Sequence, residues 1–327
     1  MILQTRRLPG SAFDRIASSG HDYVVGPPSG MTRQELLSRV PGASAIISTL
    51  ADTIDGEVMD AAGGGLKVIA NYAVGFNNID VEEATRRGIV VCNTPDVLTD
   101  ATADMAFAMV MAAARFIPQA HEFTKKGLFT GWDPELFLGQ PVWGKTMGIV
   151  GMGKIGTAVA RRAKGFGMTI LYHNRKPVPA ELEAELEARL VPLDVLLRES
   201  DFVVLLTPLT EETRGMIGER ELSLMKGSAC LVNISRGPVV VEDALVRALK
   251  EKKIFAAALD VYEREPEIHP GLFELDNAVL LPHIGSATAE AREKMAHLTV
   301  ENVLSVLDGR EPPASVNYRE VFSSKSS

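Results

Sequence analysis

Short apolar runs alternate with helical patterns along most of the chain. From Lys145 onward the runs read MGIV, TILYH, FVVLL, ACLVNI, IFAAALD and AVLL, and amphipathic stretches such as Glu242–Lys252 separate them. Parallel strands covered on both faces have this near-continuous apolar character, so the alternation predicts a doubly wound parallel sheet. Residues 41–98 repeat the pattern on a smaller scale, with AIIST, KVIANY and GIVVCN as strands and residues 81–87 as a helix. The predicted fold class is α/β, with two doubly wound parallel-sheet domains and a cleft between them.

Two long helical patterns, Asp100–Ile117 and Ala287–Leu307, flank the central block and are expected to cross between the domains. The segment after the second can then return to the first domain, which predicts one domain from residues 1–98 plus 288–327 and another from residues 99–287. Residues 180–190 carry leucines at a four-residue spacing, which predicts a further helix whose glutamates face solvent.

Composition narrows the classes of partner. The 327 residues are 46% hydrophobic and 23% charged, which is typical of a folded globular protein. A net charge of −8 provides no basic field for nucleic acid or an anionic membrane, and neither is expected as a partner. Cys92 and Cys230 lie in apolar runs, as buried thiols of a reducing compartment do, and no apolar segment suggests a signal peptide or a membrane span. A cytoplasmic location is expected.

The most specific local motif is Gly151-Met152-Gly153-Lys154-Ile155-Gly156, between the strand TMGIV and the helical pattern TAVARRAKGFG. Gly151 permits a tight turn, Gly153 lets a pyrophosphate approach the backbone, and Gly156 lets helix and strand pack closely. The context predicts a dinucleotide site in a doubly wound domain of the Rossmann-like/flavodoxin-like class. A turn with incidental glycines and a methyltransferase-type site for another adenosine ligand are the alternatives.

The end of the following strand bears on the choice of dinucleotide. A carboxylate there binds the ribose 2′-hydroxyl of NAD, but this chain has Asn174-Arg175-Lys176. The absence of a carboxylate and the presence of two cations suit a 2′-phosphate. The sequence therefore predicts NADPH as the preferred cofactor with NADH as an alternative, and a merely solvated basic turn is the competing interpretation.

Polar residues follow the later strands, where ligands of doubly wound sheets bind. They are Thr207-Pro208, Ser235-Arg236-Gly237, Asp260 and Pro282-His283. A lone histidine or arginine is usually structural, but both at one sheet edge indicate an active site. The remaining histidines show no paired spacing typical of metal ligands, and no metal is expected.

Four ordered segments resemble the signatures of the D-isomer-specific 2-hydroxyacid dehydrogenases. They are residues 151–156, Asn233-Ile234-Ser235-Arg236-Gly237, residues 258–266 and Pro282-His283-Ile284-Gly285-Ser286. Within that family, residues 70–80 and 93–104 are most similar to glyoxylate/hydroxypyruvate reductases. The resemblance implies NAD(P)H-dependent reduction of a small 2-oxo acid, glyoxylate or hydroxypyruvate, in a cleft that closes between a substrate-binding domain (1–98 plus 288–327) and a dinucleotide-binding domain (99–287).

The resemblance also implies roles for individual residues. Arg236 would bind the substrate carboxylate and polarise the keto oxygen, His283 would be the acid/base, and Glu265 would pair with His283. Histidine suits proton delivery to a developing alkoxide because its ordinary pKa is roughly 6.5, and a carboxylate on its other nitrogen favours the protonated ring. Glu263 is interpreted as an exposed loop carboxylate.

The family implies further contacts at the substrate and the cofactor. Backbone amides at Val74 and Gly75 would receive the substrate carboxylate, and a bare glycine turn is the alternative there. Asp260 would face the nicotinamide carboxamide. Thr102 would approach the cofactor from the hinge, although Asp100 and Thr102 are equally interpretable as helix-capping residues. The other expected cofactor contacts are Thr207, Pro208, Ser235, His283 and Gly285.

A homodimer built on the crossing helices is the family expectation. Related glyoxylate reductases often carry an aromatic residue near Leu136, in a loop that reaches the partner's active site, and here the position is aliphatic. Substrate size preference is therefore left open. The alternatives are a dehydrogenase for another D-2-hydroxy acid, such as lactate or phosphoglycerate, and a nucleotide-sensing interaction protein like the corepressors of the family.

Overall fold

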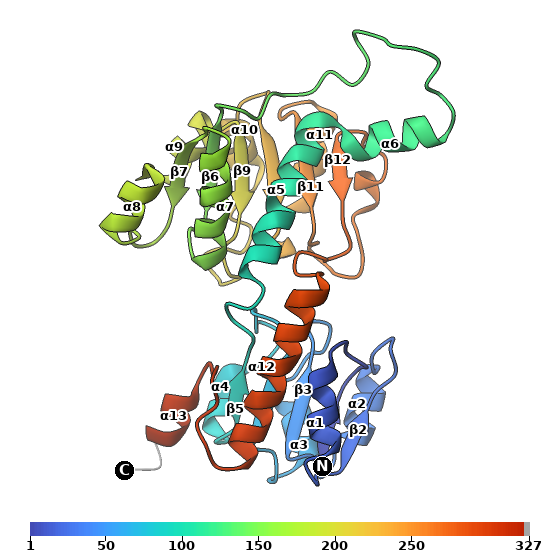
Figure 1. Ribbon diagram of the computed structural model, residues 1–327, viewed down its shortest axis with the longest axis vertical. Helices are drawn as coiled ribbons and strands as arrows, with labels where there is room; N and C mark the ends of the chain where they lie inside the picture. The colour runs from blue at the N-terminus through green and yellow to red at the C-terminus, as the bar shows by residue number, and fades with distance from the viewer. Residues whose placement is uncertain (324–327) are drawn as a thin grey trace. The chain divides into compact units, whose positions relative to one another are not determined.

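The computed structural model describes residues 1–323 and separates the chain into two compact units (Figure 1). Within the described residues, unit 1 comprises residues 1–98 and 287–323, and unit 2 comprises Thr99–Ser286. Which unit binds the substrate and which the cofactor stays a prediction at this point.

Unit 1 contains a five-stranded, wholly parallel sheet in the order β2-β1-β3-β4-β5. Its strands are β1 (Ile2–Gln4), β2 (Tyr23–Val25), β3 (Ala45–Ser48), β4 (Val68–Asn71) and β5 (Val90–Cys92). Its helices are α1 (Asp14–Ala17), α2 (Arg33–Arg39), α3 (Gly56–Ala62), α4 (Val81–Arg86), α12 (Ala289–Leu307) and α13 (Tyr318–Ser323), with the 3-10 turn η1 (Ser11–Phe13). Every residue of β3, β4 and β5 is buried, which explains their unbroken apolar runs.

Unit 2 contains a seven-stranded parallel sheet in the order β12-β11-β10-β9-β6-β7-β8. The strands are β6 (Thr146–Val150), β7 (Thr169–His173), β8 (Ala188–Leu190), β9 (Phe202–Leu205), β10 (Cys230–Asn233), β11 (Ala256–Leu259) and β12 (Ala278–Leu280). The helices are α5 (Thr99–Arg115), α6 (Ile117–Lys125), α7 (Lys154–Gly165), α8 (Ala180–Leu186), α9 (Leu193–Glu199), α10 (Glu219–Leu224) and α11 (Glu242–Lys250), with η2 (Gly237–Val239) and η3 (Pro270–Leu272).

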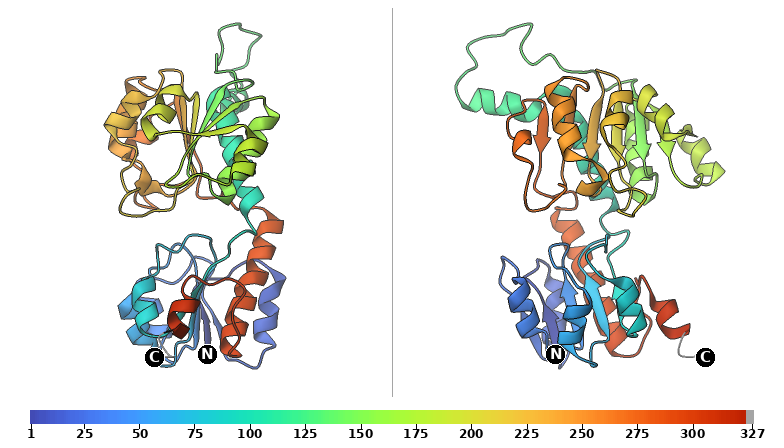
Figure 2. Two further views of the ribbon diagram at one scale, coloured as in Figure 1. Left: turned by 90° about the vertical axis from the view of Figure 1, so that its left-hand side faces the viewer. Right: turned by 180° about the vertical axis from the view of Figure 1, so that it is seen from behind.

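Helices cover both faces of each sheet, as Figure 2 shows in its left view. In unit 2, α5 and α7 contribute to the hydrophobic core on one face, and α9, α10 and α11 contribute to the core on the other. In unit 1, α2, α3 and α4 pack on one face, and α12 lies against β3, β4 and β5. The prediction of two doubly wound parallel-sheet domains is confirmed.

The predicted helix over residues 180–190 is wrong in its second half. Glu187 adopts a left-handed conformation with φ of 52°, which ends α8 at Leu186. The chain then forms β8, which pairs with β7 through Leu171 and Arg189 as an edge strand. Leucine spacing alone does not reveal such a break, because Leu190 keeps the helical period while it lies in an exposed strand position.

The hydropathy of the helices and the state of the two cysteines bear on the predictions of no membrane span and of buried thiols. Among residues 1–323 no single helix is long and apolar enough to cross a membrane, while α5 and α6 pass that test only together and meet at a bend of 65°. Cys92 and Cys230 are free and buried, and burial raises the pKa of each thiol to about 12.

Candidate active site

The glycine loop lies at the point where the strand order of the unit 2 sheet reverses. From β6 the chain continues outward through β7 and β8, and then returns to the other side of β6 as β9. Gly151 follows β6 with φ of 99°, and a Cβ there would lie 2.8 Å from the backbone of Thr207, which follows β9. A reversal of this kind is where open α/β sheets bind ligands, because the flanking loops diverge.

The loop has the properties of a pyrophosphate site. Gly153 caps the N-terminus of α7, and a Cβ on it would meet no described atom within 4 Å. A Cβ on Gly156 would lie 2.6 Å from the carbonyl oxygen of Gly151, so only glycine lets α7 start this close to the strand. The Thr207 hydroxyl is buried and has no partner among the described residues. An exposed helix N-terminus and an unpaired donor suit the phosphates of a dinucleotide.

Asn174 braces this loop. Its Oδ1 accepts a hydrogen bond from the Met152 amide at 2.7 Å, and its Nδ2 donates to the Met152 carbonyl at 3.2 Å. Arg175 and Lys176 are exposed beyond it. Hydrogen bonds from Thr210 and from its own backbone lower the pKa of Glu212, and the positive charge of Arg175 adds to this effect. The structure thus gives Asn174 a structural contact that the sequence did not suggest and leaves the two cations at the surface.

The predicted catalytic residues come together at one edge of the unit 2 sheet. Arg236 follows β10, Glu265 follows β11 and His283 follows β12, which are adjacent strands. His283 Nδ1 lies 2.8 Å from Glu265 Oε2. Burial acts to raise the pKa of Glu265, but the hydrogen bond and charge of His283 and the charge of Arg236 outweigh it, so this pKa lies below its usual range.

Burial also acts on Arg236. It lowers the pKa of the guanidinium, and the Glu265 carboxylate partly offsets the effect. Asn233 shapes the turn, because its Nδ2 donates to the Arg236 carbonyl at 3.1 Å and its Oδ1 accepts from the Ser235 amide and hydroxyl. A partly desolvated guanidinium binds an anion more strongly than one in bulk water.

Asp260 holds the backbone that carries His283. Its two carboxylate oxygens accept from the Ile284 and Gly285 amides, each at 2.7 Å, and the side chain is buried. His283 directly precedes these two residues. Its backbone has a φ of 56°, a left-handed conformation that is unusual for a residue other than glycine. A Cβ on Gly285 would lie 3.1 Å from Asp260 Oδ2, which favours glycine there. A contact from Asp260 to a nicotinamide stays a prediction.

The loop with Val74 and Gly75 lies in unit 1, after β4. Asn93 Nδ2 donates to the Val74 carbonyl and Asn71 Nδ2 donates to the Gly75 carbonyl, each at 2.7 Å. Asn78 joins the network, since its Nδ2 donates to the carbonyls of the β3–α3 loop and its Oδ1 accepts from Asn71. Neither the Val74 nor the Gly75 amide donates to an acceptor among the described residues. The sequence quoted these asparagines within motifs but assigned them no role.

The other predicted cofactor contacts are scattered around the unit 2 edge. Lys154 and Ile155 begin α7, Ser235 is buried against Asn233, and Pro208 follows Thr207. Thr102 is buried on the first turns of α5, which begins at Thr99. In residues 1–323, no group of three or more His, Cys, Asp or Glu side chains is arranged to hold a metal ion.

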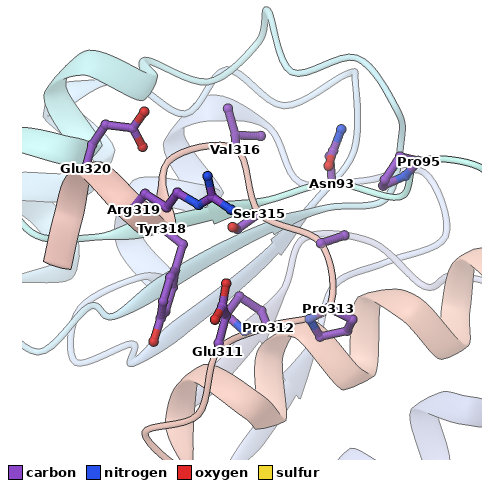
Figure 3. A pocket seen from close by; sticks show the side chains of 11 residues that line it. Asn93, Pro95, Glu311, Pro312, Pro313, Ser315, Val316, Tyr318, Arg319 and Glu320 are labelled. Atoms are coloured by element: carbon purple, nitrogen blue, oxygen red, sulfur yellow. The ribbon is translucent and has the colours of Figure 1, made fainter. Parts of the chain in front are cut away.

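A pocket of about 420 Å³ lies elsewhere, in unit 1. The C-terminal segment 311–320 forms most of its wall, together with Asn93 and Pro95 after β5 (Figure 3). None of the predicted site residues lines it. Since Asn93 contacts both this pocket and the Val74 carbonyl, the pocket lies next to the Val74 loop but is not the predicted site itself.

The glycine loop at the reversal point and the polar residues on the neighbouring strands define a dinucleotide-binding α/β oxidoreductase. Residues 107–285 match the family model described as the D-isomer specific 2-hydroxyacid dehydrogenase, NAD binding domain. The chain belongs to the D-isomer specific 2-hydroxyacid dehydrogenase family, so the predicted family and the nicotinamide cofactor are confirmed.

Individual relatives narrow the similarity. The chain is 52% identical to a glyoxylate reductase of Thermococcus gammatolerans over 98% of this chain and 96% of the relative. The crystal structure of the TT0316 protein from Thermus thermophilus superposes with a TM-score of 0.91 at 47% identity, covering 96% of this chain and 99% of that one. An NADPH-dependent glyoxylate/hydroxypyruvate reductase of Sinorhizobium meliloti, solved with NADP and malonate, gives 0.85 at 31% identity, covering 97% and 96%.

Proposed function

We propose that this protein reduces glyoxylate and hydroxypyruvate to glycolate and D-glycerate with NADPH as the preferred cofactor. The observation that carries the proposal is the convergence of Arg236, Glu265 and His283 in the loops after three adjacent strands of the unit that holds the glycine loop. Full-length similarity to glyoxylate reductases at about half identity supports the choice of substrate.

The proposed chemistry follows from the orientation of His283. Its Nδ1 faces Glu265, which leaves Nε2 to deliver a proton to the keto oxygen of the substrate. Glu265 stabilises the protonated ring through its charge. When bound, the nicotinamide cofactor supplies the hydride that reaches the carbonyl carbon, so the 2-oxo acid becomes a 2-hydroxy acid.

Arg236 is proposed to bind the substrate carboxylate and polarise the keto oxygen. A guanidinium binds a carboxylate through two parallel hydrogen bonds, which also orients the molecule. The desolvation that lowers the pKa of Arg236 is offset when an anion binds. The amides of Val74 and Gly75 are proposed as further donors to the substrate carboxylate, because both lack a protein acceptor among the described residues while their carbonyls are held in place.

The preference for NADPH is proposed from the loop after β7. No carboxylate occupies the end of that strand, and Arg175 and Lys176 are exposed cations on its continuation. A 2′-phosphate carries about two negative charges, which either side chain can bind. NADH lacks this group and is proposed as a weaker substitute.

A homodimer is proposed from the segment between α6 and β6, which Figure 1 shows as a long loop extending from the body of unit 2. It exposes several large apolar side chains, with Trp132 at 85% and Leu138 at 67% exposure. Apolar groups exposed together on one loop are typical of an interface.

A cytoplasmic location is also proposed, because both cysteines are buried and free, as is usual for proteins of a reducing compartment.

The test is a spectrophotometric panel of glyoxylate, hydroxypyruvate, pyruvate and phosphohydroxypyruvate against NADPH and NADH. Glyoxylate and hydroxypyruvate are expected to have the highest kcat/KM, and NADPH the lower KM. In Arg175→Ala, KM for NADPH is expected to rise roughly tenfold with little change for NADH, since a charged hydrogen bond is removed. Fast turnover of pyruvate alone, or equal effects on both cofactors, would contradict the respective proposal.

A further inference from the structure

The loops that carry Arg236 and Glu265 are joined to each other outside the group of proposed catalytic residues. Gly237, directly after Arg236, packs against the peptide group between Tyr262 and Glu263 so closely that any Cβ at position 237 would overlap it. This contact brings the start of η2 onto the loop that leaves β11.

Five residues further along, a second connection is made by two glutamates. The Glu263 amide donates to Glu242 Oε1 at 2.6 Å, and the Glu242 amide donates to Glu263 Oε2 at 3.2 Å. Each carboxylate therefore binds the backbone of the other residue. Glu242 begins α11, where the helix dipole favours a negative charge.

Glu242 also interacts with the far end of the same loop. The His269 backbone and ring lie close enough to the Glu242 carboxylate to oppose the rise that burial causes in its pKa, and His269 Nε2 lies 2.9 Å from Asp243 Oδ1. Glu242 is thus hydrogen-bonded to the backbone of residue 263 and lies near residue 269, and these two residues are on either side of Glu265 in the chain. We call residues 262–269, together with Glu242, the Glu242 clasp.

Both carboxylate oxygens of Glu265 have a partner, which fixes the orientation of this side chain. Glu265 Oε1 accepts from the Tyr262 amide at 3.0 Å, inside the clasp, and Oε2 faces His283. Burial raises the pKa of Glu242, and the charge of Glu263 raises it further while backbone contacts and His269 oppose the rise. Burying the Glu242 carboxyl next to the Glu263 carboxylate costs folding free energy. In return, Glu242 holds the backbone next to the Glu265–His283 pair.

We propose that Glu242 is a positioning residue for the proposed reaction, which holds residues 262–269 so that Glu265 meets His283 Nδ1. The proposal rests on the proposed function for its effect on turnover, but the pairing of Glu265 with His283 is testable without turnover. Glu242 is only 7% exposed and belongs to neither the glycine loop nor the Val74 loop. The proposal therefore gives it no direct contact with the substrate or the cofactor.

The direct readout is nuclear magnetic resonance of the imidazole nitrogens in histidine-labelled apoprotein at alkaline pH, with the His283 signal identified by its loss in His283→Gln. In the wild type, Nδ1 is expected to carry the proton, because it donates to Glu265. Glu242→Ala is expected to shift His283 toward the Nε2–H tautomer, and Glu265→Ala, which removes the acceptor itself, is expected to do the same. Glu242→Gln keeps an acceptor oxygen and is expected to restore the wild-type signal.

The kinetic readout is a double-mutant comparison with glyoxylate. Glu242→Ala is expected to lower kcat roughly tenfold with KM changed less than about threefold, because a displaced partner of the acid weakens proton transfer more than binding. In a Glu265→Gln background the same substitution is expected to cost less than about twofold, since it acts through Glu265. The pH dependence of kcat in the single variant Glu242→Ala is expected to match that of Glu265→Gln.

Glu221→Ala is the matched control. Glu221 Oε2 also accepts a backbone amide, from Gly218 at 3.1 Å at the start of α10, but it lies outside the clasp. This variant is expected to keep wild-type His283 signals and kcat. Glu263→Ala removes the acceptor of the Glu242 amide and the charge beside Glu242, but it keeps the bond from the residue 263 amide to Glu242. It is expected to shift both readouts in the same direction by a smaller amount.

Wild-type His283 signals in folded Glu242→Ala, or an undiminished effect in the Glu265→Gln background, would overturn the proposal. If Glu242→Ala does not fold, unchanged His283 signals in Glu263→Ala overturn it. A wild type that reduces none of the 2-oxo acids would refute the proposed function, while the tautomer comparison would still decide the role of Glu242.

Discussion

The two parallel sheets of this protein end in loops of different chemistry. At the carboxyl edge of unit 2, the loops after β10, β11 and β12 carry the Arg236 guanidinium, the Asp260 and Glu265 carboxylates and the His283 imidazole, among other charged groups. In unit 1, the loop after β4 is held by the neutral amides of Asn71, Asn78 and Asn93. Both sheets therefore place polar side chains at the same kind of edge, but the loop after β4 is held by neutral amides, whereas an imidazole and a carboxylate are in contact at the edge of unit 2.

Under the proposed function, this difference corresponds to two roles: substrate binding by the loop after β4 in unit 1, and proton transfer at the edge of the unit 2 sheet. Neutral amides hold a backbone in one conformation at any pH, which suits donors that only bind an anion. Charged groups in contact change their protonation with pH and with the charge of a ligand, which suits proton transfer. We therefore expect substitutions in unit 2 to change kcat and its pH dependence, and substitutions in the asparagine network to change KM alone.

The largest effect is expected for His283→Gln. Glutamine keeps a polar side chain but has no proton to deliver at neutral pH, so kcat for glyoxylate should fall by roughly 100-fold or more. His121→Gln on exposed α6 is the control and should have wild-type kcat. A loss below about tenfold in His283→Gln would remove the distinction between the two edges, because unit 2 would then contain no general acid at this position.

A smaller effect, of roughly tenfold on kcat, is expected for Glu265→Gln. The neutral amide no longer favours the protonated ring, so the decline of the reduction rate with rising pH should begin at lower pH than in the wild type. Glu267→Gln, exposed in the same loop, should leave the profile unchanged.

The same carboxyl also affects stability. The folded-state pKa of Glu265 lies below its ordinary value of 4.5, so its ionised form stabilises the fold above that pH and loses this contribution as the pH falls through the folded-state pKa. The melting temperatures of wild type and Glu265→Gln should therefore converge in acid. An identical rate profile in the two proteins would show that Glu265 does not act through His283.

The smallest effect is expected for Asn93→Ala. Loss of its bond to the Val74 carbonyl should raise KM for glyoxylate roughly three- to tenfold, the range of one neutral hydrogen bond, with kcat and the pH profile unchanged. Asn277→Ala in unit 2, which loses comparable bonds to two backbone carbonyls, is the control. A shifted pH profile in Asn93→Ala would mean that the asparagine network also takes part in proton transfer.

The sequence predicted much of the fold because its strands are buried on both faces. The runs FVVLL and ACLVNI correspond to β9 and β10, and the glycine motif of residues 151–156 was recognisable from its spacing between a predicted strand and a predicted helix. The prediction was wrong where a single backbone conformation overrides a period, at Glu187, which ends α8 early. Strands β1 and β2 were not predicted, since each has three residues and little pattern of its own.

By itself, the sequence determined the fold class, the family and the residues at the carboxyl edge of the unit 2 sheet, because each depends on patterns within a few neighbouring residues. The family resemblance already implied that Glu265 pairs with His283, and the structure identified the ring atom as Nδ1. Only the tertiary structure showed that Asp260 binds the amides of Ile284 and Gly285 and that Glu242 binds Glu263. These contacts join segments about 20 residues apart, and they depend on the direction of each side chain at the end of its strand, which no local pattern specifies.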